Sequence, residues 1–135
     1  MLAAALGEAC VLAGDISAMQ RVQELRDSFW AALQERFGDR AVLNGHPEWR
    51  LPNTLNVSFV ERVGAEILAG LDGMAASTGS ACHAGRVELS PVLAAMGVPP
   101  EVGMGAVRFS LGRATTTDEI AEVIERLSAV LARVA

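Results

Sequence analysis

The stretch GAVRFSLGRATTTDEI, residues 105–120, indicates the fold class of this chain most clearly, because its pattern is that of a strand followed closely by a helix. Apolar and polar residues alternate over VRFSL, which is the period of a strand with one buried face. Thr116 and, three residues later, Glu119 form the pattern of a capping box at the first turn of a helix. A strand and a helix joined by so short a loop indicate mixed α and β structure.

Similar patterns predict further helices and strands along the rest of the chain. The expected elements are helices over 2–13 and about 17–37, short strands within 41–47 and 53–59, a helix over 64–71, a strand over 73–78, a helix from Ser90-Pro91 to Gly97, a strand within 105–112 and a last helix after Thr116. This order predicts an α/β (α+β) fold, a two-layer sandwich in which a small mixed sheet is covered by helices.

The bulk properties narrow the functional classes. The chain has 135 residues, which fits one domain, and 51% of them are hydrophobic. The net charge of −5 argues against nucleic-acid binding. The longest apolar run is short for a membrane span, and the N-terminus lacks the basic region of a signal peptide. Two cysteines without a disulfide framework favour a reducing compartment, so we expect a cytoplasmic protein without a membrane or nucleic-acid partner.

Cys82 is the first candidate for chemistry, because it lies in the glycine-rich segment ASTGSACHAGRVELSP, residues 76–91. In such a turn a thiolate can be stabilised by backbone amides and reached by a reaction partner. A packed, inert thiol is the alternative interpretation. Cys10 lies in an alanine-rich helix and is expected in the core. The spacing of the cysteines and of His46 and His83 does not match a zinc site.

Arg108 is the second candidate, because it interrupts an apolar alternation. Its guanidinium lies either on a solvated sheet face or in a cleft, where its planar fork would suit a carboxylate. Arg113, just after this strand, is expected to be structural or at an interface. All 11 basic residues are arginine, so the chain has no lysine amine for a Schiff base.

Four segments in their order along the chain carry a resemblance to a known family. They are LPNTLNVSF (51–59), ASTGSACHAG (76–85), ELSPVLAAMGVP (88–99) and AVRFSLGRATTTDEI (106–120). Together they resemble the C-terminal part of cysteine desulfurases and selenocysteine lyases, which are pyridoxal-phosphate enzymes of the class V aminotransferase group. The resemblance implies that residues 1–135 form the small domain of a fold-type I pyridoxal-phosphate enzyme, with 1–15 as the end of the connecting helix.

The resemblance also implies roles for Cys82 and Arg108. In the family the loop cysteine attacks the sulfur of cofactor-bound cysteine, which leaves alanine and an enzyme persulfide. The sulfur then passes to an acceptor protein, for example a scaffold for iron–sulfur clusters. Arg108 matches the arginine that grips the substrate carboxylate. The pair Cys82-His83 looks closer to selenocysteine lyases, so selenocysteine is the alternative substrate.

The chain lacks the residues with which the family binds its cofactor. The family's cofactor lysine, its stacking histidine and its phosphate contacts belong to a large domain that has no counterpart here. We therefore expect pyridoxal phosphate only in a full-length enzyme, and an isolated chain that neither holds the cofactor nor turns over. Exposed apolar surface should then favour a homodimer. The alternatives are a stand-alone persulfide carrier or interaction module from a truncated gene, a selenocysteine lyase fragment, and a structural domain with an inert cysteine.

Overall fold

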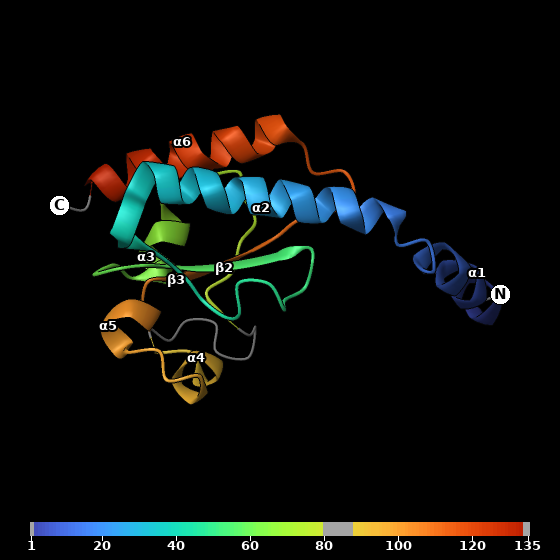
Figure 1. The fold of residues 1–135 in the computed structure, drawn as a ribbon, viewed down its shortest axis with the longest axis horizontal. Helices are drawn as coiled ribbons and strands as arrows, with labels where there is room; N and C mark the ends of the chain where they lie inside the picture. The colour runs from blue at the N-terminus through green and yellow to red at the C-terminus, as the bar shows by residue number, and fades with distance from the viewer. Residues whose placement is uncertain (1, 80–87, 134–135) are drawn as a thin grey trace.

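The computed structural model describes residues 2–79 and 88–133. Its elements are the helices α1 (Leu2–Ala13), α2 (Ser17–Phe37), α3 (Gly64–Ala69), α4 (Pro91–Ala95), α5 (Pro100–Gly103) and α6 (Thr117–Arg133), the 3₁₀ turn η1 (Gly38–Arg40), and the strands β1 (Ala41–Leu43), β2 (Thr54–Phe59) and β3 (Ala106–Ser110). Figure 1 shows α2 and α6 side by side over one face of the sheet, with α4 and α5 on the other side.

The three described strands form one sheet in the order β1-β2-β3, and both pairs are antiparallel. The predicted α/β class is therefore confirmed, whereas the strand pairs described here are antiparallel rather than mixed. The strand expected over 73–78 is reduced to one antiparallel bridge between Ser77 and Arg108. Glycine and alanine, which dominate that segment, are poor strand formers, so a longer ladder is not sustained.

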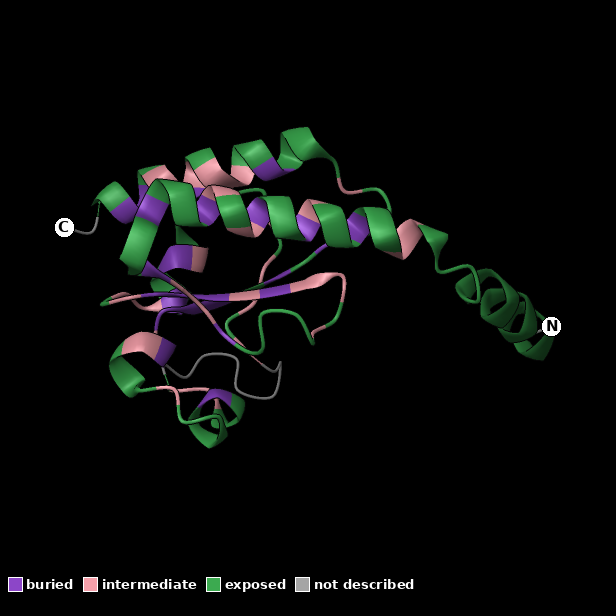
Figure 2. Ribbon diagram, in the orientation of Figure 1, coloured by how far each residue is buried: buried purple, intermediate pink, exposed green. Residues whose placement is uncertain are grey.

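One face of the sheet is apolar and forms the core with α2 and α6. The side chains at alternate positions of the strands lie against the buried stripes of the two helices, as the purple bands in Figure 2 show. The members of this core that come from the sheet and its ends are Ala41, Leu55, Val57, Phe59, Val107, Phe109 and Leu111. Phe29 of α2 meets Phe109 edge to face, with ring centroids 5.2 Å apart. Burial of this face fixes which side chains lie on the opposite face.

The ends of the helices follow the predicted capping signals in part. The capping box is present: the backbone N–H of Thr116 donates to Glu119, and that of Glu119 donates to the Thr116 hydroxyl. Pro91 lies in the first turn of α4 as expected. Ser90 occupies the N-cap position, but its side chain makes no capping hydrogen bond. Helix α5, which begins at Pro100, is an element that the sequence patterns above do not predict. Proline also fits the first turn of a new helix, where its missing N–H has no intrahelical acceptor.

Helix α1 lies apart from the rest of the described structure (Figure 1) and has no buried residue. No single described helix is long and apolar enough to span a membrane; α1 and α2 together pass that test by length and composition, but they are bent by 61°.

Candidate functional site

The second face of the sheet is polar, and it carries Arg108. Because side chains alternate along a strand, the residues between the core positions all lie on this face. They are Val42 on β1, Thr54, Asn56 and Ser58 on β2, and Ala106, Arg108 and Ser110 on β3. A sheet with one apolar and one polar face is typical of antiparallel structure, in which only one face is packed into the core.

A row of four polar residues crosses this face from one edge to the other. Asn44 follows β1, and its backbone N–H donates to the carbonyl of Asn56 at 2.9 Å. Asn56 is the register partner of Arg108. Arg108 in turn exchanges two backbone hydrogen bonds with Ser77, at 2.6 and 3.1 Å. The row Asn44–Asn56–Arg108–Ser77 therefore joins segments that lie up to 64 residues apart in the sequence.

The side chain of Arg108 is available to a ligand. The residue is exposed, and the structure gives its guanidinium no hydrogen bond or ion pair with the described residues. Its backbone, in contrast, is held between β2 and Ser77. A fixed backbone that presents an unpaired guanidinium suits a planar anion such as a carboxylate, which can accept two parallel hydrogen bonds.

Asn44, Asn56 and Ser58 form a hydrogen-bonded group beside Arg108. The Asn44 Nδ2 donates to Asn56 Oδ1 and to Ser58 Oγ, both at 2.8 Å. Ser58 is fully buried and Asn44 is 9% exposed. Neither asparagine can be identified from the sequence, because their proximity to Arg108 depends on the pairing of three separate segments. The one sequence signal for Asn56 and Ser58 is the alternation of polar and apolar residues within NTLNVSF, which places both on the same face of a strand.

Ser77 also holds the start of the cysteine-bearing segment. Its hydroxyl donates to the carbonyl of Gly79 at 2.7 Å and accepts from the Gly79 N–H at 3.2 Å. Cys82 comes five residues after Ser77, so covalent geometry limits the separation of their Cα atoms to about 18 Å. Cys82 and His83 lie outside the described residues, and their placement stays a prediction.

The remaining cysteine and histidine have clear positions, and one corrects an expectation. Cys10 is exposed on α1, so its predicted burial is wrong: α1 is apolar, but none of its residues is buried against another part of the described structure. His46 organises its own loop, because its Nδ1 accepts from the N–H groups of Glu48 and Trp49 and its ring stacks on Trp49. Among the described residues, no group of three His, Cys, Asp or Glu could hold a metal ion.

Arg113 has a structural position, as predicted. Its carbonyl accepts from Arg21, and its own guanidinium donates to the carbonyl of Asp15 at 3.4 Å. It therefore ties the end of β3 to the start of α2.

A second group of arginines lies beneath α2, away from the polar row. Arg26 is 2% exposed and binds Asp27 and the Leu51 carbonyl, while Arg50 approaches the same Asp27 carboxylate at 3.6 Å. Burial and then the neighbouring charge of Arg26 lower the pKa of Arg50. Its Nε and Nη1 are buried without hydrogen-bond partners. These two atoms are closed off from solvent, whereas the Asp27 side chain is 52% exposed, and the bond from Arg26 to the Leu51 carbonyl ties α2 to the segment that carries Arg50.

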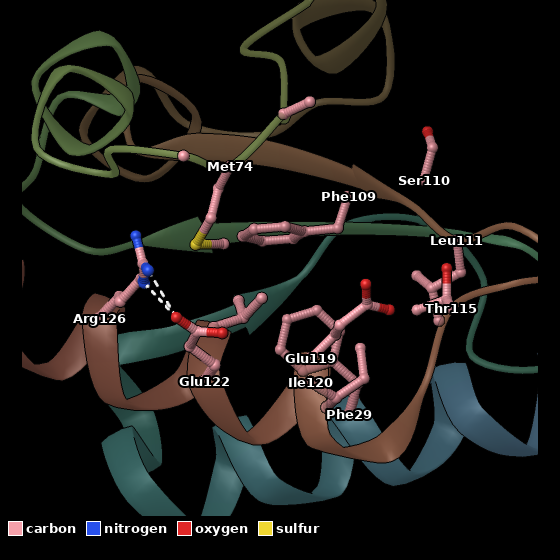
Figure 3. A pocket seen from close by; sticks show the side chains of 13 residues that line it. Phe29, Met74, Phe109, Ser110, Leu111, Thr115, Glu119, Ile120, Glu122 and Arg126 are labelled. Atoms are coloured by element: carbon pink, nitrogen blue, oxygen red, sulfur yellow. Dashed lines mark hydrogen bonds and ion pairs between the residues drawn. The ribbon is translucent and has the colours of Figure 1, made fainter.

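Figure 3 shows a cavity of about 400 Å³ between β3, α6 and residues 73–75. Sequence analysis did not predict it. Phe109 lines it from the sheet side, Phe29 and Ile120 line it from the helix side, and Glu122 and Arg126, which form an ion pair, also line it. Glu122 and Arg126 are paired with each other and Glu119 accepts from the Thr116 N–H, so the charged groups of the cavity are already engaged, whereas the guanidinium of Arg108 is not.

Comparison of the sequence with known proteins identifies relatives over nearly the whole chain. It is 38% identical over 128 residues to cysteine desulfurase IscS of Colwellia psychrerythraea, covering 93% of this chain and 31% of the relative. It is 41% identical over 132 residues to cysteine desulfurase 2 of Trichormus variabilis, covering 96% of this chain and 33% of the relative. No protein-family model matches.

Two solved structures have the same fold. A NifS-like protein from Rickettsia africae superposes with a TM-score of 0.70 at 22% identity, over 84% of this chain and 29% of that one. A second NifS-like protein superposes with a TM-score of 0.68 at 29% identity, over 85% of this chain and 28% of that one. The chain is thus homologous to cysteine desulfurases, as the sequence motifs predicted, and it spans about a third of their length.

Proposed function

We propose that this chain is the sulfur-accepting part of a cysteine desulfurase, in which Cys82 takes sulfur from L-cysteine and Arg108 holds the carboxylate of that substrate. The observation that carries the proposal is the position of Arg108. Its unpaired guanidinium lies on the polar face, and its backbone is bonded to Ser77, five residues before Cys82. An anchored substrate and a tethered nucleophile are the two parts that a sulfur transfer requires.

The proposed reaction balances with two thiols as reactants. The Cys82 thiolate attacks the sulfur of L-cysteine and forms an S–S bond, while the C–S bond of the substrate breaks. The electron pair of that bond stays on carbon, which takes a proton and becomes the methyl group of alanine. Carbon is reduced, and the transferred sulfur is oxidised to the persulfide level. An acceptor protein then removes this sulfur and restores the Cys82 thiol.

Pyridoxal phosphate does not fit the residues of this chain. Cysteine desulfurases in general use this cofactor, and an imine to it requires a primary amine. The sequence contains no lysine, so none of its side chains offers that amine. We therefore assign the cofactor to the part of a desulfurase that corresponds to the other two thirds of the relatives' length, and we expect the isolated chain to bind none.

Association and location are further parts of the proposal. We propose a homodimer, supported by the large apolar side chains that α1 exposes, Leu2, Leu6, Val11 and Leu12. We also propose a cytoplasmic location, because a persulfide persists as a carrier only where free thiols are not converted into structural disulfides.

The test combines the chain with a lysine-bearing large domain from a cysteine desulfurase, pyridoxal phosphate and L-cysteine. We expect alanine to form, and mass mapping to show one added sulfur on Cys82. Cys82→Ser should abolish the persulfide, whereas the matched control Cys10→Ser should leave it unchanged. Arg108→Ala should mainly raise KM, because a carboxylate clamp acts in the ground state as well as in the transition state.

Three outcomes would contradict the proposal. Alanine release by the isolated chain would require a cofactor attachment that the sequence does not contain. Sulfur found on Cys10 rather than on Cys82 would remove the assigned nucleophile. A chain that accepts sulfur on Cys82 from a persulfide donor, but never yields alanine with the large domain, would be a persulfide carrier. Parallel runs with selenocysteine compare the two substrates directly.

A further inference from the structure

We infer that Asn56 donates a hydrogen bond to the carboxylate that Arg108 holds, so that the substrate site pairs an amide donor with its guanidinium. The inference rests on the proposed function for the identity of the substrate, an amino acid with a free α-carboxylate. It goes beyond that function by assigning a second binding residue, on a different strand from Arg108.

The first step concerns the distance between the two residues. Positions facing each other on antiparallel strands alternate between hydrogen-bonded and non-hydrogen-bonded pairs. Arg108 uses its backbone N–H and C=O on Ser77, at the other edge of β3, so its pair with Asn56 is of the second kind. In such pairs the Cα atoms are about 4.5 Å apart and the side chains approach more closely than in the other kind. Both side chains can therefore reach one small anion.

The second step concerns the orientation of the Asn56 amide. Its Oδ1 accepts from Asn44, which lies on the β1 side of β2, whereas Arg108 lies on the β3 side. Because the oxygen is turned toward Asn44, the NH₂ group is turned away from it. Within the described part of the chain, this Nδ2 has no hydrogen-bond partner. A free amide donor thus lies beside a free guanidinium.

The third step concerns what holds this orientation. Asn44 bonds Asn56 by its side chain and by its backbone N–H, and it also bonds the fully buried Ser58. The amide of Asn56 is consequently fixed before any ligand arrives, which lowers the entropy lost on binding. An ionised carboxylate has two oxygens with about four acceptor positions, enough for the guanidinium fork and one amide N–H together.

The test is an NMR titration of the ¹⁵N-labelled full chain with L-alanine, which has the α-carboxylate of the substrate but no thiol. The Nε–H signal of Arg108 and the side-chain NH₂ signals of Asn56 should shift together along one binding curve. L-Alaninamide, in which the carboxylate is replaced, should shift neither. Shifts at Arg108 alone would overturn the inference.

The decisive variant is Asn56→Asp, which keeps an oxygen for Asn44 but replaces the free donor by an acceptor. It should weaken binding of L-alanine by about tenfold to a hundredfold, the usual effect of one hydrogen bond to a charged group. Asn53→Asp is the matched control, because it adds the same charge three residues away, where the side chain only accepts from Thr54. The ¹⁵N spectra of both variants report whether the fold is retained. Equal binding by wild type and Asn56→Asp would overturn the inference.

The inference and the proposed function fail in different assays. If L-alanine binds as expected but Cys82 never gains sulfur in the presence of the large domain, the carboxylate site stands and the desulfurase function fails. If sulfur transfer occurs but Asn56→Asp leaves KM for L-cysteine unchanged, the function stands and the role of Asn56 fails.

Discussion

Replacing Asn44 by alanine should destabilise the fold by about 3 kcal/mol, although the residue lies outside the apolar core. The variant loses the hydrogen bond to Asn56, with a net value of about 1 kcal/mol. It also leaves the hydroxyl of Ser58, which is 0% exposed, without its bond to Asn44, at a further cost of roughly 1–3 kcal/mol. For a chain of 135 residues this corresponds to a Tm lower by roughly 10 °C.

The double variant Asn44→Ala/Ser58→Ala separates the two contributions. Because the stranded hydroxyl is then absent as well, the double variant should be more stable than the sum of the single changes predicts, by about 1 kcal/mol or more. The assay is urea unfolding of the wild type, both single variants and the double variant, followed by circular dichroism. An unfolding free energy of Asn44→Ala within 0.5 kcal/mol of the wild type, or strictly additive changes, would contradict this prediction.

Three further predictions concern other parts of the fold. Thr116→Ala removes the side-chain acceptor of the capping box and should lower the free energy of unfolding by about 1 kcal/mol, whereas Thr116→Ser should retain most of it. Gly105→Ala should prevent stable folding, because its Cβ would overlap the Phe59 carbonyl oxygen; unchanged thermal unfolding would contradict this. Hydrogen bonds from the Ser17 hydroxyl and then its backbone N–H lower the pKa of Asp15, so their stabilising contribution should be present at neutral pH and lost as the pH falls through the folded-state pKa. NMR titration of the Asp15 carboxyl checks the shift, which Ser17→Ala should reduce.

The sequence predicted those elements whose local signals agree with their packing. The alternation in residues 107–111 and the capping box at Thr116 appear in the structure as β3 and the start of α6, because each is stabilised within its own segment. The expected burial of Cys10 failed for the opposite reason. An alanine-rich helix can lie in a core, but its residues are buried only where another element packs against it. No pattern in the sequence identifies such an element for α1.

The candidate site was predicted in the same uneven way. Arg108 can be identified from the pattern of a single strand, because a charged residue between apolar positions is unusual. Asn44 and Asn56 are ordinary polar residues until the register of three segments is known, because a shift of one residue would move them to the other face. The segment 73–78 shows the same limit, since Ser77 pairs with Arg108 without the ladder that its pattern predicted.

The two faces of the sheet are therefore linked by its register. Burial of Leu55, Val57 and Phe109 against α2 and α6 excludes a shift of β2 against β3 by one residue, and in the observed register Asn56 lies opposite Arg108 on the polar face. The carboxylate site is thus held by the same contacts that stabilise the core, and a backbone ladder rather than a loop sets its spacing. For this reason we expect the isolated chain to retain carboxylate binding even though it lacks the amine that the chemistry of the complete enzyme requires.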